Sequence, residues 1–510
     1  MNSDIQNHFD DPEKPVLSVP WMNTVREPLP LRPGRQLFVD DYLIESTTCR
    51  RLFHPLLPYE GNPVLKPETE LEIGNGLQPV AAPFNDGVWY DDTDHLYKLF
   101  YHAGWFRGTG CAVSRDGIHW ERPDFGIQDH TNCILPFRPG YRRDGGLVWL
   151  DREAEDPEER WKMFLFFRRD NSENGELYTS PDGIRWVFRT ETGPCGDNTS
   201  FYYDPFLGKW VFSIRSLSPV FGRTRDFFAR RDFIASPWSK EDPVSWLRAD
   251  KLDPLEAETG KEPQLYDFNA APYESLMVGL FAIFNGPEND VCARLGVPKR
   301  NDLHYAFSRD GIHWLRPDDR KPALACSRTP GTWDRGYLHA AGGICLVFRD
   351  KLRFYYGAWS GISTPRNTPP SVEAAMYAGG ATGFAELRRD GFASMHADTT
   401  ASLTTRTLRA SGKYLFINAS AAELRAEILD PSGQVLADCS AEDSLEFTGD
   451  SCCARLRWRR RETLPSGDFK IRFLLTGGDL YSFWTTDHPD GRSGGFLAAG
   501  SCDYPSGRDL

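Results

Sequence analysis

The sequence predicts an all-β protein made of a five-bladed β-propeller followed by a C-terminal β-sandwich. Three observations support this prediction. A seven-residue phrase, Ser-x-Asp-Gly-Ile-x-Trp, occurs three times. Aromatic, alternating runs precede each copy, and short apolar runs separated by turns fill the chain after residue 400. The three copies are Ser114 to Trp120, Ser180 to Trp186 and Ser308 to Trp314.

Each copy of the phrase predicts a tight turn between two outer antiparallel strands. Glycine tolerates a positive φ, and the aspartate before it can bond the turn backbone. The copies recur at about 64 residues or close to twice that spacing, and such a period indicates one supersecondary unit used several times.

Four strands are expected in each repeat, because two apolar runs precede each phrase. Four-stranded units repeated radially form the blades of a propeller, which leaves few sheet edges exposed. The inner runs are Gly87 to Tyr90, Gly146 to Leu150 and Asn269 to Tyr273, and the second runs are Leu96 to Tyr101, Trp161 to Phe167 and Leu276 to Phe284.

The predicted organisation has three parts: an N-terminal arm over 1–35, the propeller over 36–398 and the sandwich over 399–510. The run from Gln36 to Glu45 is the first clear strand, and we expect it to close the ring by pairing into the last blade. The third and fifth blades lack the intact phrase. The five blades are expected at about 76–135, 140–192, 196–250, 260–325 and 333–398.

The predicted sandwich rests on short strands separated by turns such as Pro431-Ser432-Gly433 and Pro465-Ser466-Gly467. Each apolar run is expected to be a separate strand. These runs are Leu403 to Leu408, Tyr414 to Ile417, Leu424 to Leu429, Ala454 to Trp458, Phe469 to Leu475 and Leu480 to Trp484.

Composition excludes several classes of partner. The net charge of −13 argues against nucleic acid and against an anionic membrane surface. The 11 cysteines are odd in number and scattered, which favours reduced structural thiols over a disulfide framework or a zinc site. The polar stretch from Met1 to Lys14 does not resemble a secretory signal, and no apolar run approaches a membrane span, so we expect a cytoplasmic protein.

Acidic residues stand at the entrance of four predicted inner strands, namely Asp86, Asp144, Asp197 and Asp267, and His339 holds that position in the fifth blade. Carboxylates that converge on one axis repel one another, and this repulsion moves their pKa values apart, as acid and base catalysis requires. The alternative for each aspartate is a structural role in a turn.

The second strand of each blade returns to the same face, so its end should reach the same funnel. Cations and amides around carboxylates, with tryptophan faces nearby, describe a sugar site. In the alternative interpretation, Arg168 and Arg215 hold buried acids between blades. Glu262 enters from a loop as the best general acid, and Asp334 is a second candidate. The strand-end residues are His102, Arg168, Arg215 and Asn285, with Trp105 and Trp359 just beyond.

This layout resembles the five-bladed propeller glycosidases, in particular the fructosidase-like glycoside hydrolase family 32 and its relatives acting on arabinans, xylans and mannosides. Asn85-Asp86-Gly87 looks like a reduced W-M-N-D-P-N-G motif, Arg143-Asp144-Gly145 like R-D-P, and Glu262-Pro263 loosely like E-C-P. The resemblance implies Asp86 as nucleophile or base, Asp144 as transition-state stabiliser, Glu262 as acid, and an appended β-sandwich.

The sequence therefore predicts a hydrolase that cleaves an O-glycosyl bond of a carbohydrate. A mannoside-type phosphorylase is the first alternative, with Arg143, Arg168, Arg215 and His339 available for phosphate. A carbohydrate-binding propeller without catalysis is the second. The repeated phrase is also similar to the Asp-box of sialidases, but that box is structural. No organic cofactor is expected, because no glycine-rich phosphate loop follows a strand, and a divalent ion held by the aspartate ring and His339 is a further hypothesis.

Overall fold

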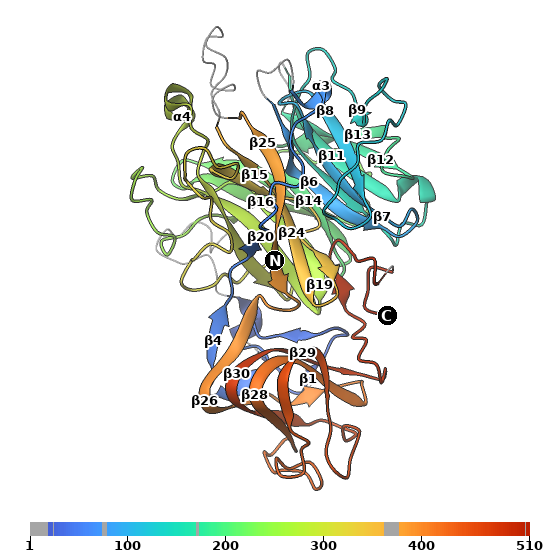
Figure 1. The fold of residues 1–510 in the computed structure, drawn as a ribbon, viewed down its shortest axis with the longest axis vertical. Helices are drawn as coiled ribbons and strands as arrows, with labels where there is room; N and C mark the ends of the chain where they lie inside the picture. The colour runs from blue at the N-terminus through green and yellow to red at the C-terminus, as the bar shows by residue number, and fades with distance from the viewer. Residues whose placement is uncertain (1–18, 24, 74–78, 170–172, 362–376, 505) are drawn as a thin grey trace.

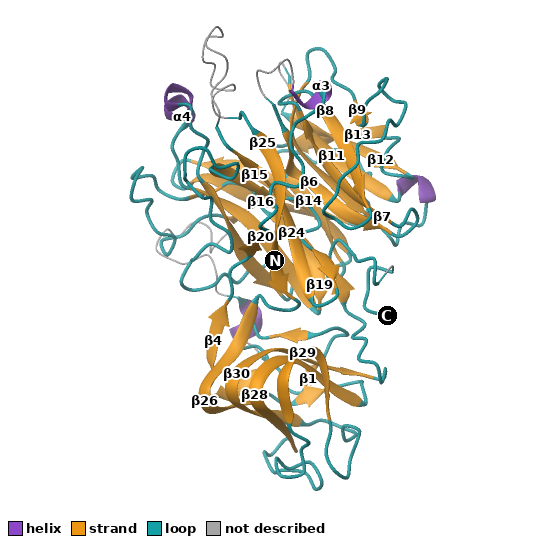
Figure 2. Cartoon of the chain, in the orientation of Figure 1, coloured by secondary structure: helices purple, strands orange, loops and turns teal. Residues whose placement is uncertain are grey.

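The computed structural model describes residues 19–510 apart from 24, 74–78, 170–172, 362–376 and 505, and this part of the chain is nearly all β (Figures 1 and 2). The described helices are short: α2 (Pro20–Asn23), α3 (Glu70–Ile73), α4 (Asn289–Leu295) and the 3-10 turn η2 (Pro157–Glu159). Among the described residues, no helix combines the length and apolar character needed to cross a membrane.

The largest sheet has eight strands and consists of two four-stranded halves. The halves join through their first strands, β6 and β10, which pair in parallel where Asn85 faces Gly146 and Asp86 faces Leu147. Two of the predicted acidic positions therefore lie at one seam. The strands are β6 (Ala81–Asp91), β7 (Leu96–Ala103), β8 (Gly108–Ser114), β9 (Cys133–Leu135), β10 (Arg142–Leu150), β11 (Trp161–Arg168), β12 (Asn174–Ser180) and β13 (Val187–Pro194).

Three further sheets follow along the chain, and one apolar core runs through all of these sheets. The first contains β14 (Ser200–Asp204), β15 (Lys209–Ser218), β16 (Gly222–Arg230) and β17 (Val244–Leu247). The second contains β18 (Gln264–Leu265), β19 (Asn269–Glu274), β20 (Leu276–Phe284), β21 (Asn301–Ser308) and β31 (Phe496–Leu497). The third contains β5 (Leu57–Pro58), β22 (Gly336–Ala340), β23 (Leu346–Phe348), β24 (Lys351–Trp359) and β25 (Gly380–Arg388).

The predicted Asp-Gly turns are confirmed at all three positions. In each copy the aspartate Oδ1 accepts hydrogen bonds of 2.8–2.9 Å from the backbone N–H groups two and three residues ahead. The serine Oγ accepts a 2.9 Å bond from the glycine N–H. Gly117, Gly183 and Gly311 have φ of 71°, 74° and 73°, a conformation that favours glycine.

A seven-stranded sheet dominates the C-terminal part and curls around a second apolar core. Two pairs of runs expected as separate strands are each one long strand, so this expectation was wrong. Neither strand is interrupted by a turn. In β28 the pairing register shifts between Ala421 and Leu424, and β30 continues through Gly477 and Gly478. The strands are β2 (Gln36–Leu37), β3 (Ile44–Thr47), β4 (Arg50–Phe53), β26 (Ala393–Thr405), β28 (Tyr414–Leu429), β29 (Phe447–Leu456) and β30 (Lys470–Thr486), while β1 (Leu29–Pro30) pairs separately with β27 (Leu408–Arg409).

The strand beginning at Gln36 does not close the ring, contrary to expectation. It pairs with Phe483 and Ser482 of β30, and β3 and β4 also join the C-terminal sheet. The reason is its alternation, because Leu37 and Val39 pack into the large core while Phe38 packs into the second core. The outer strand of the last of the three sheets, β25, instead pairs with β5.

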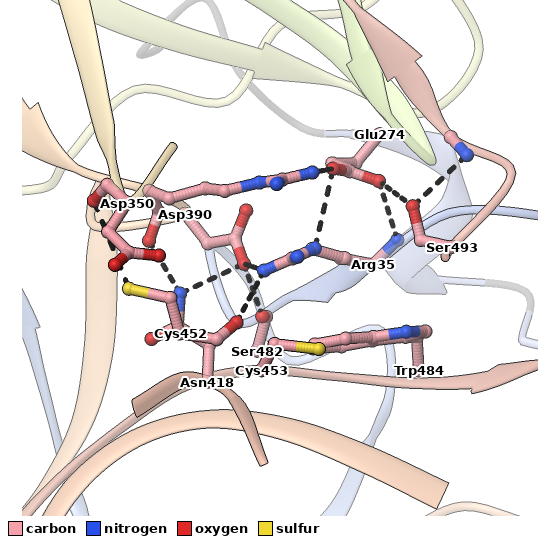
Figure 3. A network of polar contacts seen from close by, with 12 residues as sticks. Arg35, Glu274, Asp350, Asp390, Asn418, Cys452, Cys453, Ser482, Trp484 and Ser493 are labelled. Carbon is pink, nitrogen blue, oxygen red and sulfur yellow. Dashed lines mark hydrogen bonds and ion pairs between the residues drawn. The ribbon is translucent and has the colours of Figure 1, made fainter. Parts of the chain in front are cut away.

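A buried network of charges joins the two cores (Figure 3). The Arg35 guanidinium lies between Glu274, at the end of β19, and Asp390, which follows β25; its Nη1 is 3.0 Å from Asp390 Oδ2. Asp390 also accepts a 2.6 Å bond from Ser482 of β30. Since Arg35 stacks 4.1 Å over the ring of Trp484, the network couples both sheets.

Candidate active site

A cavity of about 280 Å³ opens between β11, the sheet of β14 to β17 and the sheet that begins with β18. It has the size of a site for a small sugar. Ligand pockets usually have few charged groups among apolar and aromatic side chains, but this lining contains six charged residues. Its charged lining is Arg168, Glu173, Asp197, Arg215, Arg223 and Lys299, with the rings of Phe166, Tyr266 and Tyr377 beside them.

One guanidinium in this lining holds two of the predicted acidic residues. Arg168, the last residue of β11, donates from Nε to Asp144 Oδ2 and from Nη2 to Asp197 Oδ2, the latter at 2.6 Å. Arg215 Nε lies 3.3 Å from the other oxygen of Asp197. The structure therefore brings together four residues that the sequence predicted for the site: Asp144, Asp197, Arg168 and Arg215.

The two carboxylates have opposite pKa shifts. The pKa of Asp144 is raised because the group is buried and because the charge of Asp197 lies nearby. Arg168 opposes this shift but does not cancel it. Burial would also raise the pKa of Asp197, but Arg215, Arg168 and Lys299 outweigh it and lower that pKa. One member of the pair is thus biased toward the protonated acid and the other toward the carboxylate.

Asp86 lies apart from this pair in a closed environment. It is fully buried, pairs with Arg143 through one oxygen and accepts a 2.7 Å bond from the Phe84 N–H through the other. Burial raises the pKa of Asp86 although Arg143 opposes the shift. Asp86, Arg143 and Asp144 are not among the residues that line the cavity, but Asp144 is joined to the lining because it binds the guanidinium of Arg168.

Asp267 and His339 form a second buried pair, with His339 Nδ1 3.0 Å from Asp267 Oδ2. Burial lowers the pKa of His339 although Asp267 opposes this, so the imidazole is neutral. Its Nε2 has no hydrogen-bond partner among the described residues. The ring packs 4.0 Å from Phe84, inside an aromatic cluster.

Trp105 and His102 belong to the same aromatic cluster. Trp105 stacks on Tyr377 at 3.8 Å and is 2% exposed. His102 Nε2 accepts a 3.0 Å bond from the Phe106 N–H, and burial lowers the pKa of His102 far below its usual value. These two predicted substrate contacts support the cavity wall from behind, through Tyr377.

Glu262 and Asp334 lie outside the cavity. Glu262 is exposed on the loop before β18, and Asp334 is half-buried on the loop before β22. Neither side chain is part of the lining around Asp197.

The chain adopts unusual backbone conformations next to the predicted acidic positions. Asn85 and Asn198 have φ of 75° and 59°, and Tyr337 has φ of 58°. Asparagine tolerates this region, but a bulky tyrosine there is an outlier held by its surroundings. Register shifts at Ala82/Gly87, Arg143/Gly146 and Gly336/His339 mark irregular pairing in β6, β10 and β22, beside Asp86, Asp144 and His339.

Within the described ranges, no three His, Cys, Asp or Glu side chains gather as metal ligands would. The divalent ion therefore stays a hypothesis.

Sequence reasoning missed Arg223, Lys299, Tyr266 and Tyr377. Lys299 follows α4 and Arg223 lies on a third strand, outside the two strand positions used for the prediction.

No protein-family model and no curated protein matches the sequence. Solved structures with similarity to the chain include an exo-β-1,3-galactanase from Phanerochaete chrysosporium, with 11% identity over 79% of this chain and 96% of that chain, at a TM-score of 0.37. They also include a fructofuranosidase from Schwanniomyces occidentalis, with 12% identity over 84% and 97% and a TM-score of 0.38.

A third similar structure comes from a study of glycoside hydrolase family 130, which comprises mannoside phosphorylases and hydrolases of β-1,2-mannosidic linkages. It shares 15% identity over 66% of this chain and 94% of that chain, at a TM-score of 0.37. The structural neighbours are thus glycosidases of families 32, 43 and 130.

Proposed function

We propose that this protein is a glycoside hydrolase that cleaves the O-glycosyl bond of an oligosaccharide or small glycoside. The observation that carries the proposal is the pair Asp144 and Asp197, held by one guanidinium with pKa values shifted in opposite directions. Two carboxylates whose environments separate their pKa values are the arrangement that glycosidases use as acid and as nucleophile or base.

The architecture we propose is a five-bladed propeller with a C-terminal β-sandwich. The eight-stranded sheet supports two blades and the three following sheets support one each. In such a disc, inner strands β6, β10, β14, β19 and β22 surround one axis.

In the proposed reaction, Asp144 gives its proton to the glycosidic oxygen as the bond from that oxygen to the anomeric carbon breaks. Ionised Asp197 acts as nucleophile or base at that carbon. Water supplies the hydroxyl group of the new hemiacetal. Its remaining proton restores Asp144 when Asp197 is the nucleophile; when Asp197 is the base, Asp197 takes that proton and releases it to solvent while Asp144 takes one up from solvent. The products are two free hydroxyl compounds, and no other reactant is consumed.

This assignment differs from the roles that the motif resemblance implied. Asp86 is fully buried, pairs with Arg143 and does not line the cavity, whereas Asp197 does, so Asp86 suits a supporting role better than attack. Glu262 is exposed away from the cavity. The acid role therefore passes to Asp144, and the role of nucleophile or base passes to Asp197.

A phosphorylase is the second candidate, and the cations in the cavity favour it. Phosphate would then replace water as the attacking group, and the product would be a sugar 1-phosphate.

The test is turnover of a panel of aryl glycosides and oligosaccharides, with and without phosphate. Turnover without phosphate supports the hydrolase, and turnover that requires phosphate supports the phosphorylase. Sugar binding by the wild type without any turnover would instead support a carbohydrate-binding propeller and contradict both enzymes.

A further inference from the structure

The cavity holds more positive charge than its carboxylates balance. Four cationic side chains line it, against the carboxylates of Asp197 and Glu173, and Asp144 binds Arg168 from outside the lining. Two of the cations are committed, because Arg168 and Arg215 bind Asp197. The other two cations, Lys299 and Arg223, are not balanced in this way.

Lys299 is a buried ammonium group, with 2% of the residue exposed. Its Nζ donates a 2.8 Å hydrogen bond to Tyr266 Oη, and among the described residues it forms no ion pair with a carboxylate. The rings of Tyr266 and Tyr337 lie 4.9 and 5.1 Å from Nζ. Ring faces offset part of the cost of burying an ammonium, but an anion offsets more.

Arg223 enters the same cavity from β16. Its Nη1 donates a 2.6 Å bond to Gln264, a neutral partner, while its Nη2 lies 3.9 Å from Glu288. Glu288 is bound more closely by Lys261, at 2.6 Å. The guanidinium of Arg223 is therefore only weakly neutralised and keeps donors for a ligand.

We propose that Lys299 and Arg223 form an oxyanion subsite, which takes a carboxylate or phosphate group in the cavity next to Asp197. This inference rests on the proposed function, because it names the class of ligand that the same cavity prefers. An ammonium and a guanidinium that line the same cavity match the charge of such a group, and guanidinium donors match its geometry. The oxyanion is either the carboxylate of an acidic sugar or free phosphate.

The test is calorimetric titration of the purified full chain with sodium glucuronate, inorganic phosphate and glucose at fixed ionic strength. We expect at least one of the two anions to bind at least about tenfold more tightly than glucose. Lys299→Met keeps the length of the side chain without the charge and should weaken that binding by about tenfold or more. Lys240→Met, at an exposed lysine, is the matched control and should change nothing.

Arg223→Gln is the second variant and should also weaken anion binding. Melting curves of all variants establish that they are folded. Equal binding of glucuronate, phosphate and glucose by the wild type, or unchanged anion binding in folded Lys299→Met and Arg223→Gln, overturns the subsite.

Activity assays separate the two sources of the oxyanion. Faster cleavage of glucuronides than of the matching glucosides, with phosphate as a competitive inhibitor, assigns the subsite to an acidic sugar. Phosphate-dependent formation of a sugar 1-phosphate assigns it to free phosphate. Because binding is measured without turnover, an inactive protein that binds the anion contradicts the proposed function alone, and an active protein that does not bind it contradicts the subsite alone.

Discussion

Arg168 Nη2 lies 2.6 Å from Asp197 Oδ2 while Nε of the same guanidinium donates to Asp144. This side chain comes from the end of β11, and its two partners come from the inner strand of one sheet and the loop before the next. A single cation thus fixes the relative position of two carboxylates from different sheets. It favours ionisation of both, but the deeper burial of Asp144 keeps the pKa of that group raised.

The first prediction concerns the proposed acid. Asp144→Asn keeps the shape of the side chain but cannot deliver a proton, so we expect kcat to fall by about 10²–10⁴-fold with little change in sugar affinity. Steady-state kinetics and calorimetry with a product sugar check both parts. A substrate whose leaving group needs no proton, such as a dinitrophenyl glycoside, should recover much of the rate, and an unchanged rate on ordinary glycosides would remove Asp144 from the acid role.

The second prediction is the pH profile. Activity requires ionised Asp197 and protonated Asp144, so kcat/KM should rise as pH increases through the lowered pKa of Asp197 and fall as pH passes the raised pKa of Asp144. The pH range of constant kcat/KM should therefore begin below the usual pKa of an aspartate and end above it. In Asp144→Asn the falling limb should disappear while the rising limb stays, and persistence of the falling limb would assign it to another group.

The third prediction removes the shared cation. In Arg168→Met both carboxylates lose a charge that lowers their pKa, so both limbs of the profile should move to higher pH. Arg115→Met, at an exposed arginine in the first Asp-Gly turn, is the control. If kcat/KM fell at every pH while both limbs kept their positions, Arg168 would not set the pKa values of Asp144 and Asp197.

Local features of this fold could be predicted from the sequence, and features that depend on distant contacts could not. The turn around Asp116 was predictable because its bonds lie within five residues. Asp144 and Asp197 were predictable from their place at strand entrances. Lys299, after α4, and Arg223, on β16, were missed because they lie far apart in the sequence and meet only in the folded chain, so no local pattern marks them.

The pairing of the first strand was also beyond the sequence. Side chains alternate along this segment as in any strand, but the two faces pack into different cores: Leu37 and Val39 into the large core and Phe38 into the second core. The alternation of side chains along a strand does not indicate which sheet has an edge available for pairing.

The fourth prediction concerns the buried network between the cores. Arg35→Met leaves Glu274 and Asp390 with one cation fewer in a site where the carboxylates are fully buried, and breaking such a pair costs about 3–5 kcal/mol. The free energy of unfolding from urea titration measures this cost. Arg50→Met removes an ion pair to Asp398 that is largely exposed and should leave stability unchanged; equal effects of the two variants would contradict the role given to the network.

The fifth prediction compares two costs of replacing a glycine: the strain of a left-handed backbone and the collision of the added Cβ with its neighbours. Gly126 and Gly311 both have positive φ, 69° and 73°, but a Cβ at Gly126 meets open space whereas one at Gly311 would collide with Asp204. Gly126→Ala should cost about 1–2 kcal/mol for the left-handed backbone, and Gly311→Ala should cost about 1–3 kcal/mol more for the clash. Chemical denaturation measures both, and equal losses would show that the third turn relaxes.

The proposal depends most on the carboxylate of Asp197. The direct measurement is the release of sugar from the best glycoside of the panel by the wild type and by Asp197→Asn at equal protein concentration. We expect turnover by the wild type and a loss of about 10²–10⁴-fold in the folded variant, with calorimetry still detecting the bound sugar. If the folded Asp197→Asn variant released sugar at the wild-type rate, that result would contradict the proposed role of Asp197.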